Sequence, residues 1–474
     1  MFTKLIQRDP RTVRLLWLSF AVVLFNGVGV LFFMLDMRLP VALLAAVIGV
    51  LVAVKNPLAG VALVLAGRLT STGANAWVRI GSINLDLFEP ALLLALGALL
   101  VHTMAKRDLH IPDAPWRLPV LVFLAYQIVS LTWTTSFTEA IQEVIATLIL
   151  LTTTFVILAF VRDWKQLRGI LLVWIGVSFM IGFLAALGMG APSETSQFEM
   201  AQGNRSGGFG QHPNWFAMNL MYSVTMAFAL GFIEKSKSRR WGFYAVGIAI
   251  FLFQMASGSR GGTGAIAIGA IIAGLFHPGL RSTMVKWGGI GLALVSLVIL
   301  SDTGAFTTAF SRIWVDSGTV LGASVRESNW VVCWQMLVDT MGRGIGGGGY
   351  EDLLANYNTW LYNSIYRYPH GIFWGMMAHY GVVGMTLWAW FLAMVVRMTV
   401  QAVNWTQDHD LQAVVLAMFG AMVGYFAWSF FEFMYDDKPF WEFLGLYTVL
   451  WGLARQIGTK TALTEETLKT QAVS

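Results

Sequence analysis

Long apolar runs follow one another along almost the whole chain, and short polar segments separate them. The runs are about 16 to 24 residues long, and a helix of that length crosses a hydrocarbon core roughly 30 Å thick. They are continuously apolar rather than alternating, which is typical of membrane helices and not of β-barrel strands. The predicted spans are 14–34, 39–54, 56–68, 87–103, 118–134, 143–161, 169–189, 214–233, 241–257, 262–276, 287–301, 371–396, 411–431 and 439–454. Because the run at 56–68 is short, we expect about 12 to 14 spans.

Composition supports the same class of protein. Of the 474 residues, 57% are hydrophobic and 12% are charged, whereas a soluble domain carries about 25% charged residues. The predicted fold class is all-α, a polytopic integral membrane protein with one long outer loop that contains helices. The basic N-terminus, MFTKLIQRDPRTVRLL, precedes an apolar run without a small-residue cleavage site, so we interpret it as a retained anchor. The single cysteine, Cys333, excludes an internal disulfide, and the net charge of +5 does not suggest nucleic acid as a partner.

The distribution of lysine and arginine predicts the orientation of the spans. With the N-terminus inside, the segments AKRDLHIPDAPWR, VRDWKQLR, EKSKSRR and HPGLRSTMVK all fall inside and hold most of the basic residues, in agreement with the positive-inside rule. The predicted organisation is N-terminal spans over 1–200, central spans over 201–301, an outer loop over 302–369, C-terminal spans over 370–456 and an inner tail over 457–474.

The basic residues that remain outside are almost all arginine. They are Arg38, Arg68, Arg79, Arg205, Arg260, Arg312, Arg326, Arg343, Arg367 and Lys438. Topology alone depletes lysine and arginine equally, so retained arginine indicates a need for a planar, bidentate donor to phosphate or carboxylate. The alternative is that these residues anchor the interface or pair with outer acids, which we expect for roughly half of them.

The outer loop contains one predicted helix. In RESNWVVCWQMLVDTM, helical spacing places Trp330, Trp334, Leu337 and Met341 on one apolar stripe, which we expect to be buried by a helix lying on or near the membrane. The following GRGIGGGGYED ends that helix. Its glycines could bring backbone N–H groups to an anion, but a flexible hinge is the favoured interpretation.

Polar groups gather at the outer ends of several spans. Arg205 lies with His212 in NRSGGFGQHPN, and Arg260 lies in SGSRGG between two spans. Arg326 opens the loop helix, and Arg367 precedes His370. Each has a structural alternative: Arg260 could cap a helix or contact lipid phosphate, and His212 could cap or anchor its span.

His370 is the candidate base. Pro369 favours the first turn of a helix, so His370 is expected at a helix N-terminus, where a neutral imidazole accepts a proton and an anion is stabilised. A carbonyl-bonded interfacial histidine is the alternative. His379 lies nine residues later, on the opposite face, and we interpret it as a packing or inter-helix hydrogen-bonding residue. The outer segments contain no metal-binding motif, and no Walker loop occurs, so no metal or cofactor is predicted.

The order of these motifs resembles the O-antigen ligase and polymerase superfamily. NRSGGFGQHPN, SGSRGG, SVRESNW, GRGIGGGGY and PHGIFWGMMAHYGVVG follow one another between about residues 200 and 395. Two positions depart from the family pattern. Gly371 replaces a common asparagine, which affects the orientation of His370, and His379 replaces a common acid, which removes any role of that acid.

The resemblance implies a metal-independent glycosyl transfer, inverting at the sugar, on the periplasmic face of the bacterial inner membrane. The donor would be an undecaprenyl-diphosphate-linked glycan, and the acceptor a sugar hydroxyl of lipid A core or of another lipid-linked glycan. Arg205, Arg260 and Arg326 would bind the donor diphosphate, with Arg367 and His212 as further candidates. His370 would activate the acceptor hydroxyl. Other polysaccharide assembly proteins are expected as additional partners.

Other functions remain open. A transporter or flippase of the lipid-linked glycan would carry its polar groups near the bilayer midplane, often on broken helices, whereas these lie at span ends. A purely structural subunit would not need the outer arginines. Ligase and polymerase share the motifs, and the loop aromatics, which could stack on a growing sugar chain, favour a polymerase. They are Trp314, Trp330, Trp334, Tyr350, Tyr357, Trp360, Tyr362, Tyr366 and Tyr368.

Overall fold

The computed structural model describes residues 56–69, 78–80, 83–85, 91–93, 95–99, 101, 113–187, 213–300, 320–363, 367–431 and 437–473. The predicted spans at 14–34 and 39–54 lie outside these residues, as do Arg205 and His212.

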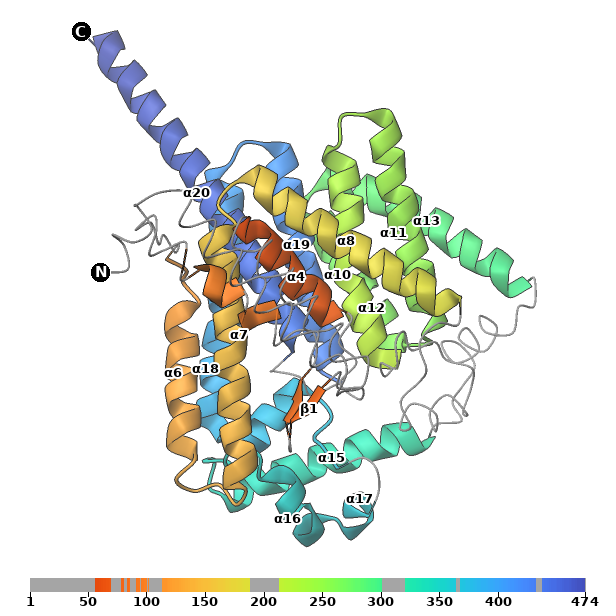
Figure 1. The fold of residues 1–474 in the computed structure, drawn as a ribbon, viewed down its shortest axis with the longest axis vertical. Coiled ribbons are helices and arrows are strands. Elements are labelled where there is room, and N and C mark those ends of the chain that lie inside the picture. Colours follow the sequence, from red (N-terminus) through yellow and green to blue (C-terminus); the bar gives the residue numbers. More distant parts are fainter. Residues whose placement is uncertain are drawn as a thin grey trace, which may run out of the picture.

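The described helices are α4 (Pro57–Leu69), α6 (Arg117–Ser130), α7 (Phe137–Phe160), α8 (Trp164–Ala186), α10 (Pro213–Ile233), α11 (Lys237–Ala256), α12 (Arg260–Phe276), α13 (Pro278–Leu300), α15 (Val320–Asp339), α16 (Tyr350–Tyr357), α17 (Thr359–Tyr362), α18 (Ile372–Trp405), α19 (His409–Ser429) and α20 (Lys438–Val473). Five of them, α7, α8, α10, α18 and α19, are long and apolar enough to cross a membrane. By length and composition, these apolar helices form a bundle of the kind found in membrane proteins (Figure 1).

Several predicted boundaries need correction. The all-α prediction missed a short antiparallel hairpin, in which β1 (Val78–Ile80) pairs with β2 (Ile83–Leu85). Its β-branched residues favour extended backbone. α13 begins nine residues before the predicted span at 287, and α20 continues to Val473 through the predicted inner tail. Apolar run length indicates the membrane-crossing part of a helix, and a helix can continue beyond it.

Small residues bring the central helices into close contact. A Cβ added at Gly269 of α12 would lie 2.7 Å from the carbonyl oxygen of Gly420 in α19. At Gly424 of α19 an added Cβ would collide with the backbone of Ala265. Membrane helices associate through such close backbone packing, because lipid provides no hydrophobic drive for one helix to leave it for another. The α12–α19 pair is therefore a fixed part of the bundle.

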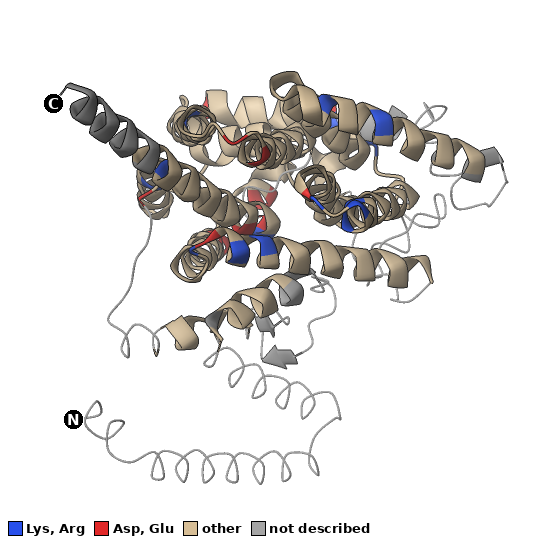
Figure 2. Cartoon of the chain, turned by 90° about the horizontal axis from the view of Figure 1, so that it is seen from above, with Lys and Arg blue, Asp and Glu red and all other residues tan. Residues whose placement is uncertain are grey.

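The two ends of the bundle differ in charge. The connection between α10 and α11 lies at one end, and Figure 2 views the molecule from this end, where Lys and Arg mark several helix ends. Buried Glu234 there pairs with Arg168 and, at 3.4 Å, with Arg239. A hydrogen bond from the Ser236 backbone amide, and to a lesser extent one from Arg168, holds the pKa of the Glu234 carboxyl below its usual value. The α6–α7 connection and helices α15–α17 lie at the opposite end, hereafter the outer end (Figure 1).

The predicted orientation can be tested by thiol labelling. The thiol of Cys333 is buried and burial raises its pKa, so the natural chain should react little with an impermeant maleimide. Exposed Asn356 lies in α16 at the outer end, and exposed Ser238 lies in α11 at the other. We expect Asn356→Cys to label in intact cells and Ser238→Cys to label only after lysis. The reverse pattern would overturn the orientation.

Candidate functional site

Helix α15 lies across the outer end of the bundle, as Figure 1 shows, and packs on α18. Its buried face is made by Val325, Asn329, Cys333 and Met336. The predicted stripe is wrong in two members, because Trp334 is 56% exposed and Met341 is 96% exposed. The helix carries apolar residues on two faces, and the spacing alone could not indicate which face would meet α18.

Trp330 connects α15 to His370. Its indole Nε1 donates a hydrogen bond of 2.7 Å to the backbone carbonyl oxygen of His370, and its ring stacks on Trp374 of α18 at a centroid distance of 5.3 Å. Arg326 lies four residues before Trp330 on α15, so the two share one helix face. The start of α18 and the face of α15 that bears Arg326 therefore meet at this tryptophan.

Arg260 is the first residue of α12, and α19 connects its position to that of His370. The Ser259 side chain caps α12 by accepting a hydrogen bond from the Gly262 amide at 3.2 Å. A Cβ on Gly261 would lie 2.8 Å from the Trp428 ring of α19. Two residues later, the carbonyl oxygen of Phe430 occupies the space beside Gly371. Contacts through the end of α19 thus run from the start of α12 to the residue after His370.

His370 lies before helix α18 rather than in its first turn. Gly371 has a φ of 111° and is the residue before the helix, which begins at Ile372. The expectation for Pro369 is therefore wrong, because a left-handed glycine separates it from the helix. The His370 side chain is buried, with 5% exposure, and its ring centroid lies 4.6 Å from that of exposed Tyr368. Tyr368 therefore packs against the imidazole near the surface.

Two other outer arginines have structural partners. Arg367 forms an ion pair with Glu351 at 3.2 Å, and its guanidinium lies 5.3 Å from the centre of the Tyr362 ring. The Arg343 guanidinium lies 5.4 Å from the centre of the Trp133 ring. Pairing with outer acids is one of the alternatives for such arginines, and the ion pair of Arg367 with Glu351 fits it. Arg367 is directed toward α16 and α17.

The glycine segment 342–349 is a docked loop and not a hinge. The amides of Ile345 and Gly346 donate to the carbonyl oxygens of Ala378 and His379 at 2.9 and 2.8 Å, and the Val382 amide donates to Gly342 at 2.9 Å. α18 is broken where the loop docks, because Gly381 has φ 60° and ψ −157°. Such backbone is essentially restricted to glycine. The glycines therefore permit direct backbone pairing, so the hinge interpretation is wrong.

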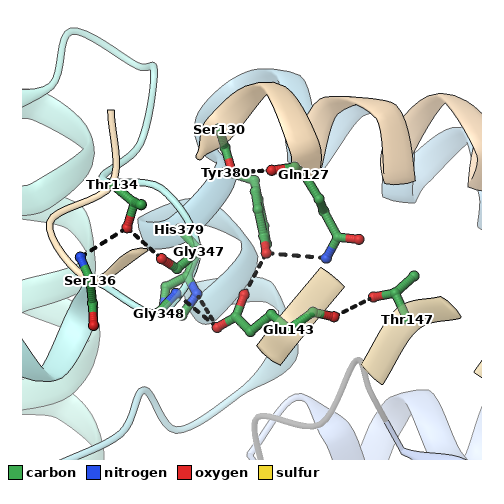
Figure 3. Close-up of polar contacts among 10 residues, drawn as sticks. All are labelled: Gln127, Ser130, Thr134, Ser136, Glu143, Thr147, Gly347, Gly348, His379 and Tyr380. Carbon is green, nitrogen blue, oxygen red and sulfur yellow. Dashed lines mark hydrogen bonds and ion pairs between the residues drawn. The ribbon is translucent and has the colours of Figure 1, made fainter. Parts of the chain in front are cut away.

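Sequence reasoning missed Glu143, which holds this docked loop from the other side (Figure 3). Its carboxylate accepts hydrogen bonds from the Gly348 amide at 2.9 Å and the Tyr380 hydroxyl at 2.5 Å, and lies 3.3 Å from His379 Nδ1. The Gln127 amide donates in turn to the Tyr380 hydroxyl at 3.1 Å. These contacts join α6, α7, α18 and the loop, and they confirm that His379 makes an inter-helix contact.

A signal for Glu143 was present in the sequence. It is an acid at the start of a predicted membrane span, and an ionisable residue at such a position usually has a specific partner. What the sequence could not supply was the identity of that partner, which lies more than 200 residues away.

The elements that carry Arg260, Arg326 and His370 meet at the outer end, through the contacts of Trp330 and of the end of α19. Within the described part of the chain, no three His, Cys, Asp or Glu side chains are grouped so as to hold a metal ion. A comparison with models of known protein families finds no match to this chain, and a comparison with curated proteins finds none either.

Proposed function

We propose that the protein transfers a glycan from an undecaprenyl-diphosphate carrier to a sugar hydroxyl, on the periplasmic face of the bacterial inner membrane. The observation that carries the proposal is that the three elements bearing Arg260, Arg326 and His370 meet through Trp330 and the end of α19 at one end of an apolar bundle. Such a transfer needs cationic groups for the donor diphosphate and a base for the acceptor hydroxyl, and these residues can supply both.

The two arginines suit the diphosphate of the donor. A guanidinium donates two parallel hydrogen bonds to phosphate oxygens, and its charge offsets the charge that develops on the leaving diphosphate. Arg260 starts α12, whose N-terminal amides add a partial positive charge. Arg205 and His212 lie outside the described residues and stay candidates by sequence only. The ion pair with Glu351 directs Arg367 toward α16 and α17, so we assign it to the loop structure.

His370 suits the acceptor. The acceptor oxygen attacks the anomeric carbon, the bond from that carbon to the diphosphate oxygen breaks, and His370 takes the hydroxyl proton. The lipid diphosphate leaves as a stable anion, so no general acid is required. Attack opposite the leaving group inverts the anomeric centre. Transfer to lipid A core would make the protein a ligase, and transfer to another lipid-linked glycan would make it a polymerase.

A flippase is the rival function, and the break in α18 is the feature that would favour it. Transporters place such breaks near the bilayer midplane. The loop that docks at the break is held by Thr134 of the α6–α7 connection, whose hydroxyl donates to the Gly347 carbonyl oxygen at 2.6 Å, and that connection lies at the outer end. We therefore favour the enzyme.

Lysine substitutions test the diphosphate assignment. Arg260→Lys and Arg326→Lys keep the charge but lose the bidentate geometry, and a charged hydrogen bond contributes roughly 1.5–3 kcal/mol. We therefore expect turnover to fall about ten- to hundredfold for each variant. The assay uses purified protein in nanodiscs with undecaprenyl-diphosphate-linked glycan, an acceptor glycan and EDTA.

Arg343→Lys is the matched control, because Arg343 is an exposed outer arginine in contact with Trp133. It should retain most turnover. If both lysine variants at 260 and 326 made product at the natural rate, or if EDTA abolished turnover, the proposed function would fail.

A further inference from the structure

An apolar cavity of about 200 Å³ opens between α10, α11, α12 and α13. Its walls include Val224, Phe228, Phe251 and Trp287, and small residues such as Ala267 and Gly288 widen it. Thr225 and Thr263 are the polar residues in the lining, and the Thr263 hydroxyl already donates to the Ser259 carbonyl at 3.1 Å. The lining therefore suits a hydrocarbon and offers little to a polar ligand.

Arg260 begins α12, the helix that forms one wall of this cavity, and it lies at the outer end of that helix. Thr263, Ala267 and Ala270 all line the cavity, and they lie three, seven and ten residues after Arg260. Residues at that spacing form one stripe of an α-helix. Arg260 therefore begins the same stripe that lines the cavity. Ala267 is exposed, so the stripe is open at its middle.

We propose that this cavity holds part of the polyprenyl tail of the donor lipid, with the diphosphate at Arg260. The inference rests on the proposed function and adds the place of the tail. An anionic head followed by a hydrocarbon chain matches a guanidinium followed by an apolar stripe of small residues. The remainder of the tail lies in the bilayer beside α12 and α13.

The expected energetic effect is moderate. The tail is already out of water in the bilayer, so entering the cavity gives no hydrophobic gain. The gain is in dispersion contacts with the walls, each small but many together. The cavity should therefore select among lipid tails and fix the position of the diphosphate, and filling it should weaken binding by roughly three- to tenfold.

Two adjacent glycines of α13 give a matched test. Gly288 lines the cavity and Gly289 does not, and a Cβ on either would meet no atom within 4 Å. Native mass spectrometry of nanodisc-purified protein would measure the affinity for undecaprenyl diphosphate and, separately, for phosphatidic acid. We expect Gly288→Phe to weaken undecaprenyl diphosphate binding three- to tenfold and to leave phosphatidic acid binding unchanged. Gly289→Phe should change neither.

If Gly288→Phe and Gly289→Phe changed the affinity for undecaprenyl diphosphate equally, the proposal would be overturned. It would also be overturned if Gly288→Phe weakened phosphatidic acid binding as much as undecaprenyl diphosphate binding, because the cavity would then be a site for ordinary lipid. If Gly288→Phe does not fold, Ala267→Leu narrows the cavity from α12 and should give the same loss. These measurements need no turnover. If Gly288→Phe weakens undecaprenyl diphosphate binding as expected but the natural protein makes no glycan product, the tail site stands and the proposed function is rejected. If the natural protein makes product but Gly288→Phe binds undecaprenyl diphosphate normally, only the tail site is rejected.

Discussion

Replacing His370 by alanine should lower glycan transfer about 10²- to 10⁴-fold, the usual contribution of a general base. The proposed role is to take the proton of the acceptor hydroxyl. Binding of the undecaprenyl-linked donor should change little, because the arginines hold the diphosphate. Product is measured in nanodiscs with purified donor and acceptor, and donor affinity is measured on the same preparation.

His379→Ala is the informative comparison. His379 is buried beside Glu143, so its loss removes a partner of that carboxylate and should lower stability more than the intrinsic rate. His370→Gln tests whether hydrogen bonding without proton transfer suffices, and we expect it to remain as inactive as the alanine variant. Full turnover by His370→Ala would exclude the mechanism.

Replacing Gly381 by alanine should destabilise the protein severely. Its φ of 60° and ψ of −157° suit only glycine, and an added Cβ would collide with the backbone of Gly342 and Arg343. Backbone strain costs roughly 1–3 kcal/mol, and overpacking against atoms that cannot rotate away adds about 1–3 kcal/mol. We expect a clear fall in the apparent melting temperature in detergent, together with loss of transfer.

Gly169→Ala provides the control. Gly169 lies inside α8, and a Cβ there would meet no atom within 4 Å. Alanine in a helix interior is favoured over glycine by roughly 0.5–1 kcal/mol, so this variant should melt at the same temperature or slightly higher. A Gly381→Ala protein as stable as Gly169→Ala would show that the loop does not dock on α18 as described.

Local pattern was enough to predict several of the long apolar helices, but it did not predict which elements they contact. Apolar runs predicted α7, α8, α10 and α19 to within a few residues at most ends, apart from the first turns of α7 and α8, since each run is a local property. The buried face of α15 depended on α18, which lies later in the chain, and so the predicted face was partly wrong. The same is true of the glycine segment, whose conformation depends on the break in α18.

For the candidate site residues too, the sequence indicated the residues but not their contacts. Arg260, Arg326 and His370 were found from residue type and position, but only the fold shows that Trp330 and the end of α19 bring their elements together. Arg367 met the same sequence criteria, and the fold shows that its ion pair with Glu351 directs it toward α16 and α17. Glu143 had a weak local signal, and its partners Gly348, His379 and Tyr380 are all distant in sequence.

The docked glycine loop has a mechanical consequence. Three main-chain hydrogen bonds join the loop to α18, and the Glu143 carboxylate accepts a further bond from the loop. Together with the Trp330 bond to His370, these contacts make α15, the loop and the outer turns of α18 one unit, which carries both Arg326 and His370. Arg260 belongs to a different rigid piece, the α12–α19 pair, which glycines lock together. A seam therefore runs between the two pieces, where Phe430 meets Gly371 and Trp330. Under the proposed function, we expect the site to open for a bulky glycan along this seam, with His370 and Arg326 moving together relative to Arg260.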